Sequence, residues 1–449
     1  MWQRFKNRIR MLKPAQLIVA YYFFAISLSF ALLRLPGVHK PGQEVSLIDS
    51  LFTAVSAVSV TGLTVISISE EYTVFGIVMV MLILQLGGIG IMSLGTFVWL
   101  LIGKRIGLRE RQLIMVDHNQ YNLSGVVKLI IEIIKILLLI EAIGALFLSV
   151  YFTQFYDTWR EALLHGLFAS VSATTNGGFD ITGESLVPYA NDYFVQVITI
   201  FLIILGAIGF PVLIELKQFL SNKSGHFRFS LFTKLTTLTF GILLVIGTVL
   251  IFIIEYNKRF ADVSWHEAFF YSLFHSVSTR SGGLTTLDVS TFSEPTQLVL
   301  SLLMFIGASP SSVGGGIRTT TLAIAVLFLV NFSRGREQIQ VFGREIHLID
   351  VFRSYVVIIL ATTMSMLSIL LIMIFEEQSL ISVIFEVTSA FGTSGMSMGI
   401  TPSLSTPSKF ILMILMFVGR VGLISFLFMI GGNNKKEKFH YPKERVIIG

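Results

Sequence analysis

Long apolar segments alternate along the chain with shorter ones, and polar residues gather in the connections between them. The eight long segments are residues 14–35, 73–102, 126–153, 192–219, 231–255, 295–330, 351–375 and 409–430. About 20 helical residues cross the hydrocarbon core of a bilayer, so each of these segments is long enough to be a membrane span. The pattern therefore predicts an all-α polytopic membrane protein with eight spans.

Four shorter apolar runs lie between the two long segments of each successive pair. They are too short to cross a bilayer, so we expect them to be re-entrant pore helices. Each run ends in a glycine loop: Val60-Thr61-Gly62, Asn176-Gly177-Gly178, Ser281-Gly282-Gly283 and Thr393-Ser394-Gly395. The predicted plan is a span, a pore helix, a loop and a second span (M1–P–M2), repeated four times around a central pore.

The repeats are visible in residue identity as well as in hydropathy. A serine recurs near the end of each short run, as Ser56, Ser172, Ser278 and Ser389. The third copy is one residue shorter between this serine and Gly283. Two crossings per repeat return the chain to the same side, so all four copies are parallel and can surround one axis, unlike inverted repeats.

The distribution of basic residues predicts the orientation. Segments on one side of the predicted membrane hold 22 Lys and Arg residues, and those on the other side hold six, including Arg280. The basic side is expected to be cytosolic and to hold both termini. The resulting boundaries are an N-terminus at 1–13, repeat 1 at 14–102, a cytosolic loop at 103–125, repeat 2 at 126–220, repeat 3 at 221–330, a cytosolic loop at 331–350, repeat 4 at 351–430 and a C-terminal tail at 431–449.

Composition narrows the possible chemistry. The chain is 53% hydrophobic and 13% charged, whereas about a quarter of the residues of soluble domains are charged. It has no cysteine, which excludes disulfides and thiolate metal sites. The net charge of +6 is located in the connections, which favours membrane orientation over nucleic-acid binding. No catalytic pair or metal-spaced histidines lie within the spans, so neither an enzyme nor a resident cofactor is expected.

The glycine loops are suited to binding a dehydrated cation. Carbonyl oxygens can replace the hydration shell of an ion only if several backbones approach one axis, and glycine permits that approach. The short helices could also direct their partially negative C-terminal ends towards the cavity. One such loop is most simply a helix cap or a turn. Four copies at equivalent places favour a selectivity filter made of the twelve loop residues named above.

The long segment 295–330 is interrupted by a glycine-rich and serine-rich stretch. Proline and consecutive glycines disfavour helix, and a bilayer tolerates irregular backbone only beside a cavity or other protein segments. Other second spans carry only short glycine motifs at this place, so we expect a gate here, with close helix packing as the alternative. The predicted gate comprises Gly307, Ser309, Pro310, Ser311, Ser312, Gly314, Gly315, Gly316 and Arg420.

Charges inside the spans are few. Arg420 lies in the middle of the last span, where it could form a positive barrier, bind the carbonyls of the gate or pair with Glu141. Arg318 follows the gate. Glu161 and Glu267 begin two of the short helices, where they could attract cations. A favourable interaction with the helix N-terminus is the preferred explanation.

The chain resembles the Trk/Ktr/HKT superfamily of potassium transporters. The resemblance rests on the M1–P–M2 plan, the glycine loops and the motif Gly307-Ala308-Ser309-Pro310-Ser311-Ser312; one departure is Gly283-Leu284 where Gly-Phe is common. It implies that Gly62, Gly178, Gly283 and Gly395 select K⁺ and that the interrupted span is a gating loop. It also implies a homodimer in the lipid membrane, gated by a cytosolic nucleotide-binding ring of the RCK type. Coupling to Na⁺ is left open, and a coupled secondary carrier remains the alternative function.

Overall fold

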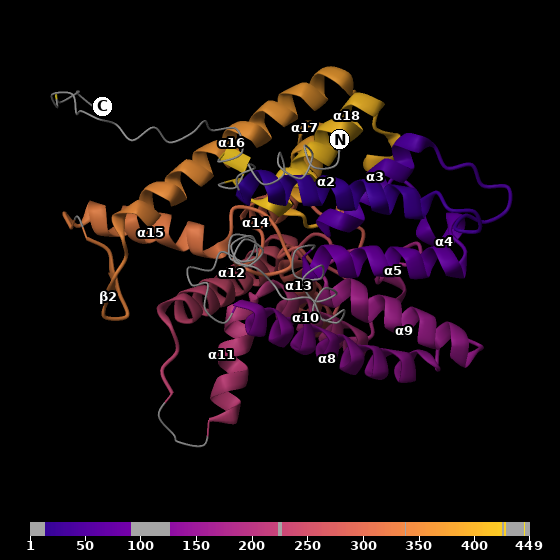
Figure 1. Cartoon of the computed structure of the whole chain (residues 1–449), viewed down its shortest axis with the longest axis horizontal. Coiled ribbons are helices and arrows are strands. Elements are labelled where there is room, and N and C mark those ends of the chain that lie inside the picture. Colours follow the sequence, from indigo (N-terminus) through magenta and orange to yellow (C-terminus); the bar gives the residue numbers. More distant parts are fainter. Residues whose placement is uncertain are drawn as a thin grey trace, which may run out of the picture.

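The computed structural model describes residues 14–90, 126–222, 227–336 and 338–423, together with 426, 427 and 444. The predicted cytosolic segments 1–13 and 103–125 lie outside these residues, as does nearly all of the tail 431–449. Fifteen α-helices occupy most of the described part of the chain (Figure 1).

Four of the helices are long and apolar. They are α2 (Pro14–Leu33), α8 (Val126–Phe152), α12 (Leu231–Glu255) and α16 (Leu348–Phe375). Large apolar side chains stay exposed along them, with Phe23 at 70%, Ile253 at 65% and Ile374 at 74% exposure. Such a surface is stable where lipid rather than water covers it.

A short helix follows each long one and packs against it. The short helices are α3 (Leu47–Ser59), α9 (Trp159–Thr174), α13 (Trp265–Ser278) and α17 (Leu380–Gly392). Each begins after a serine or threonine cap, a residue type that satisfies free backbone N–H groups. The Glu161 N–H bonds to the Thr158 side chain, and Glu267 completes a capping box with Ser264. The two glutamates therefore lie in the first turns of their helices, in agreement with the preferred explanation that they interact with the helix N-termini.

A third set of helices completes the pattern: α5 (Val74–Ile89), α10 (Tyr193–Ala207), α14 (Glu294–Ile306) and α18 (Thr406–Val421). The α4 turn (Ile68–Glu71) and the 3-10 turns η1 (Val187–Tyr189), η2 (Val289–Thr291) and η3 (Thr401–Ser403) precede them in order. Each third helix ends one or two residues before a glycine with positive φ: Gly90 at 87°, Gly209 at 104°, Gly307 at 72° and Gly422 at 88°.

Helix breaks are thus more general than the sequence predicted. The segment 192–219 was expected to be one span, but α10 and α11 (Phe210–Ser221) meet at an angle of 105°. Gly209 adopts a backbone angle that favours glycine, and Pro211 cannot continue the hydrogen-bond ladder across the bend. Among the described helices, four are long and apolar enough to span a membrane, or five if this bent pair counts as one. The predicted eight spans are not eight uninterrupted helices.

A long helix, the short helix after it and the third helix together are called a unit here. The third unit continues after its break as α15 (Thr319–Ser333), which lies against α16. Between them, in the predicted loop 331–350, β1 (Gln340–Val341) and β2 (Arg344–Glu345) form a small antiparallel hairpin. This hairpin is the exception to the predicted all-helical fold in the described part of the chain. Together α15, the hairpin and one end of α16 extend to the side of the molecule in Figure 1.

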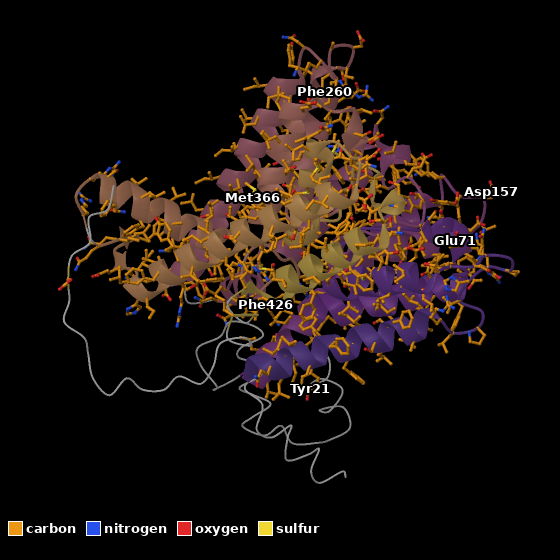
Figure 2. The ribbon with its side chains drawn as sticks, turned by 90° about the horizontal axis from the view of Figure 1, so that it is seen from above. Tyr21, Glu71, Asp157, Phe260, Met366 and Phe426 are labelled. Atoms are coloured by element: carbon orange, nitrogen blue, oxygen red, sulfur yellow. The ribbon has the colours of Figure 1, made fainter. Side chains whose placement is uncertain are left out.

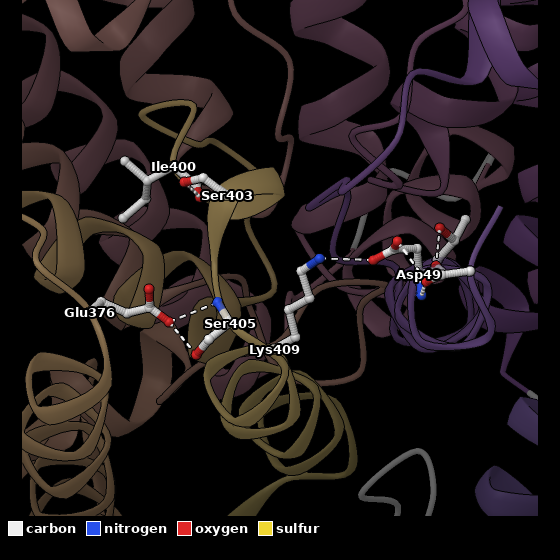
Figure 3. Close-up of polar contacts among 8 residues, drawn as sticks. Asp49, Glu376, Ile400, Ser403, Ser405 and Lys409 are labelled. Atoms are coloured by element: carbon white, nitrogen blue, oxygen red, sulfur yellow. Dashed lines mark hydrogen bonds and ion pairs between the residues drawn. The ribbon is translucent and has the colours of Figure 1, made fainter. Parts of the chain in front are cut away.

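The first and last units lie side by side. Helices α3 and α18 are in contact, and Phe52 and Leu63 share a buried cluster with Val387 and Leu415. An ion pair of 2.8 Å between Lys409 Nζ and Asp49 Oδ1 crosses the same seam (Figure 3). In Figure 2 Phe260 lies at the top of the molecule, Asp157 and Glu71 lie at its right side, and Tyr21 lies at the bottom.

Candidate functional site

The loops that follow the four short helices share an unusual backbone. Val60, Asn176, Ser281 and Thr393 have φ values of 56°, 52°, 71° and 48°. A positive φ is unfavourable for β-branched residues such as Val60 and Thr393, so the surrounding structure must impose it. Two residues later each loop has a glycine with positive φ: Gly62, Gly178, Gly283 and Gly395. The shared geometry aligns Gly283 with the other three despite the shorter third copy.

These four glycines form a closed ring. Each one abuts the carbonyl oxygen that precedes the glycine of the next loop, and the fourth loop returns to the first. A β-carbon added to Gly62, Gly178, Gly283 or Gly395 would lie 2.6, 3.4, 2.5 or 2.1 Å from the carbonyl oxygen of Gly177, Gly282, Ser394 or Thr61, respectively. Side chains at these positions would push the backbones apart, so glycine is required for the approach.

The recurring serine of each short helix holds its loop in place. The serine carbonyl accepts the N–H of the residue before the ring glycine at 2.7–2.8 Å, in the pairs Ser56–Thr61, Ser172–Gly177, Ser278–Gly282 and Ser389–Ser394. The hydroxyls of Ser56 and Ser389 also accept from the Gly62 and Gly395 N–H groups, at 3.1 and 3.0 Å. The sequence revealed that these serines recur but not what they bind.

A buried carboxylate supports the fourth loop. Glu386 of α17 is 1% exposed and accepts from the Ser397 hydroxyl at 2.6 Å, the Met398 N–H at 2.9 Å and the Thr401 hydroxyl at 2.8 Å. These contacts fix the chain that leaves Gly395. Glu386 was not among the predicted site residues, although it is the single acid in an otherwise apolar and small-residue helix.

The interrupted segment of the third unit, residues 307–318, is here called the flap. Its two ends are hydrogen-bonded to each other. The Ala308 N–H donates to the Gly315 carbonyl at 3.1 Å, and the Arg318 N–H donates to the carbonyl of Ile306, the residue before the flap, at 2.9 Å. The Arg318 guanidinium donates to the carbonyls of Ser309 and Gly314. These bonds satisfy backbone groups that a helix would otherwise pair.

The flap also pairs with the bend between α10 and α11. The Ser309 N–H donates to the Ala207 carbonyl at 3.0 Å, and the Phe210 N–H donates to the Ser311 carbonyl at 2.8 Å. A third bond joins the Val313 N–H to the Gly206 carbonyl at 3.3 Å. The two irregular segments thus satisfy each other, which is the condition for non-helical backbone at membrane depth.

Predicted gate residues lie directly against predicted filter residues. A β-carbon on Gly314 would lie 2.4 Å from Ser281 Oγ, and one on Gly315 would lie 2.6 Å from Thr393 Oγ1. The Gly315 N–H donates to Ser281 Oγ at 3.3 Å, and that hydroxyl donates to the Gly392 carbonyl at 2.9 Å. The flap therefore covers the third and fourth loops.

Two arginines differ from the sequence expectations. Arg420 donates to the carbonyls of Gly87 and Gly88 on α5, whereas the Glu141 carboxylate accepts from Gln85 Nε2 at 2.5 Å. The considered Arg420–Glu141 pair is thus absent from the described residues. It is Arg318, not Arg420, that binds the flap carbonyls. Arg280 was counted only as one of the cations of the predicted external segments; its side chain is 0% exposed, because it lies inside the third glycine loop and under the end of α14.

Comparisons with known proteins identify the family of the chain. The TrkH family model, described as a cation transport protein, matches residues 6–435. Ktr system potassium uptake protein D of Bacillus subtilis is 54% identical over 446 residues, 99% of each chain. Potassium/sodium uptake protein NtpJ of Enterococcus hirae is 31% identical over 452 residues, also 99% of each chain.

A solved structure shares the fold. The crystal structure of the potassium transporter TrkH from Vibrio parahaemolyticus matches with a TM-score of 0.73 at 18% identity, covering 94% of this chain and 86% of that one. Because the family model spans nearly the whole chain and two relatives exceed 30% identity along their full length, membership does not depend on one motif. The chain belongs to the TrkH family of cation transport proteins.

Proposed function

We propose that the chain is the potassium-conducting membrane subunit of a K⁺ uptake system, and that the ring of glycine loops is its selectivity filter. One observation carries the proposal: each of the four glycines abuts the carbonyl oxygen of the next loop around a closed ring. Carbonyl oxygens held around an axis can replace the hydration shell of a cation. The four units are then parallel M1–P–M2 repeats around the pore, with glycine loops facing outside and both termini in the cytosol.

The flap is the gate in this proposal. It follows the break at the end of α14, touches Ser281 and Thr393 of the filter loops, and is joined to its surroundings mostly by backbone hydrogen bonds. Such a segment can change its partners without unfolding a helix. Arg318 supplies the charge that holds its inner turn.

Potassium is favoured as the transported ion because all four ring positions are glycine, and because two relatives are named as Ktr system potassium uptake proteins. The name of the Enterococcus hirae relative includes sodium as well, so the proposal leaves open whether K⁺ uptake is coupled to Na⁺. The word "system" in the relatives' names favours a separate regulatory subunit. We propose a cytosolic nucleotide-binding ring of the RCK type bound to a homodimer of this chain in the lipid bilayer.

Growth rescue tests the filter. A bacterium that lacks its own potassium uptake would express the chain with a cytosolic partner at low external K⁺. The wild type should restore growth, and Gly62→Ser should lose the preference for K⁺ over Na⁺. Gly42→Ser is the matched control, because Gly42 has nearly the same φ, 88° against 90°, but no atom lies within 4 Å of its added β-carbon.

Failure of the wild type to rescue growth would refute the transport function. Rescue by Gly62→Ser with unchanged ion preference would refute the assignment of Gly62 to the filter. A coupled carrier of another cation or small solute is the alternative, and the closed ring of backbone carbonyls supports a cation over another small solute.

A further inference from the structure

We propose that Arg280 is a positioning residue that joins the third glycine loop to the hinge of the flap and thereby holds the gate closed. The proposal rests on the gate function proposed above. It concerns how the filter and the gate are connected, which neither the geometry of the ring nor that of the flap explains alone.

Arg280 lies two residues after Ser278 at the end of α13, and its side chain is 0% exposed. The guanidinium donates to the Leu303 carbonyl at 2.7 Å and to the Gly307 carbonyl at 3.3 Å. Leu303 is in the last turn of α14, and Gly307, with φ of 72°, is the residue where the helix stops and the flap begins. One side chain of the filter loop thus binds the hinge.

The location also explains why a buried cation is tolerated. Among the ion pairs of the described residues, none includes Arg280, and its other polar contact is the Thr279 hydroxyl at 3.3 Å. The carbonyls of the last turn of a helix lie at the partially negative end of its dipole, which stabilises a cation there. The end of α14 therefore stabilises the buried charge as long as it stays under the guanidinium.

The next residue holds the other end of the flap. Ser281 Oγ accepts from the Gly315 N–H at 3.3 Å, so consecutive residues of one glycine loop bind both the start and the end of the flap. Hydrogen bonds with a charged donor are roughly twice as strong as neutral ones. Arg280 is accordingly the stronger anchor, and outward movement of the hinge must break its two carbonyl contacts.

Removal of the anchor should favour the open gate. If the flap is closed in most wild-type molecules, we expect Arg280→Met to raise the maximal K⁺ uptake rate about tenfold. A tenfold shift of the equilibrium between closed and open flap corresponds to about 1.4 kcal/mol. The K⁺ concentration for half-maximal uptake and the K⁺/Na⁺ preference should not change, because the glycine ring itself is intact. Arg280→Lys keeps the charge but not the two-pronged geometry, so it should give an intermediate rate.

The experiment measures initial K⁺ uptake over a range of K⁺ concentrations in cells that express the chain with its cytosolic partner. Five forms are compared: wild type, Arg280→Met, Arg280→Lys, a deletion of residues 311–316, and the deletion combined with Arg280→Met. His275→Met is the matched control, because His275 is equally buried in α13 but contacts the Tyr271 and Leu287 carbonyls rather than the flap. Expression and monodispersity in detergent are checked for each form.

The coupling is supported if the deletion and Arg280→Met each raise the rate and the combination adds nothing to the deletion alone. It is overturned if Arg280→Met leaves the rate unchanged or lowers it, acts equally with and without the flap, or alters ion preference. It is also overturned if His275→Met has the same effect as Arg280→Met, or if the effect of Arg280→Met is explained by a loss of folded protein. Both outcomes overturn it even when Arg280→Lys behaves as wild type. No rise from the deletion would instead refute the gate itself, and the coupling with it.

Discussion

Replacement of Gly395 by alanine should disturb the glycine ring in a way that can be estimated from the structure. The added β-carbon would lie 2.1 Å from the Thr61 carbonyl oxygen, whereas ordinary contact begins at 3.4 Å. The fourth and first loops must therefore separate by about 1.3 Å, and displacements of about 1 Å at a functional centre can reduce activity about a hundredfold. The φ of 89° adds a backbone cost of about 1–2 kcal/mol.

Gly399→Ala separates these two effects. Gly399 is in the same unit and has φ of 81°, but nothing lies within 4 Å of its added β-carbon, so it carries the backbone cost alone. Purified protein in liposomes would be assayed for K⁺ and Na⁺ flux, and its thermal stability would be measured in detergent. Both variants should lose stability, Gly395→Ala more than Gly399→Ala because of its added contact with the Thr61 carbonyl, and only Gly395→Ala should lose K⁺ selectivity. Equal selectivity in the two variants would show that ring spacing does not control ion preference.

Two further predictions concern polar contacts at the ends of the helices (Figure 3). Burial acts to raise the pKa of the Glu376 carboxyl, but hydrogen bonds from Ser405 and the charge of Lys409 outweigh it and hold the pKa below its ordinary 4.5. The stabilisation is therefore present above pH 4.5 and is lost as the pH falls through the lowered pKa. The melting temperature of wild type should exceed that of Glu376→Gln at pH 7, and the two should converge as the pH falls below 4.5. A difference that stays constant with pH would contradict this. The Asp49–Lys409 pair should give a coupling free energy of about 1 kcal/mol in a double-mutant cycle of Asp49→Asn and Lys409→Met, and added salt should reduce this coupling. Zero coupling would show that the ion pair does not stabilise the seam between the first and last units.

Much of the fold follows from local properties of the sequence. Length and hydropathy locate the four long helices, and capping residues such as Thr158 and Ser264 mark where short helices begin. Pro310 and the glycines around it predict an irregular segment, because they cannot sustain a helix. The bend at Gly209 was missed, since the short motif Gly206-Ala207-Ile208-Gly209, with Pro211 two residues later, is compatible with either a continuous or a broken helix.

The candidate site depended more on tertiary structure. Repetition in the sequence identified Gly62 and its three counterparts, because equivalent residues in repeated units occupy equivalent places. Hydropathy could not place Arg280, because a cation beside a polar loop has the same local pattern whether it faces water or the end of a helix. The partners of Arg420 were equally inaccessible, since Gly87 is 333 residues away in the chain.

The sequence by itself thus determined which segments are apolar, where helices start, and which glycines are equivalent, because these depend on the preferences of neighbouring residues. Only the tertiary structure decided that the carbonyl of Thr61 meets Gly395, that the flap pairs with the bend of another unit, and that Arg280 binds its hinge. These contacts join residues far apart in the chain, and they form only when the packing of whole helices brings the loops together.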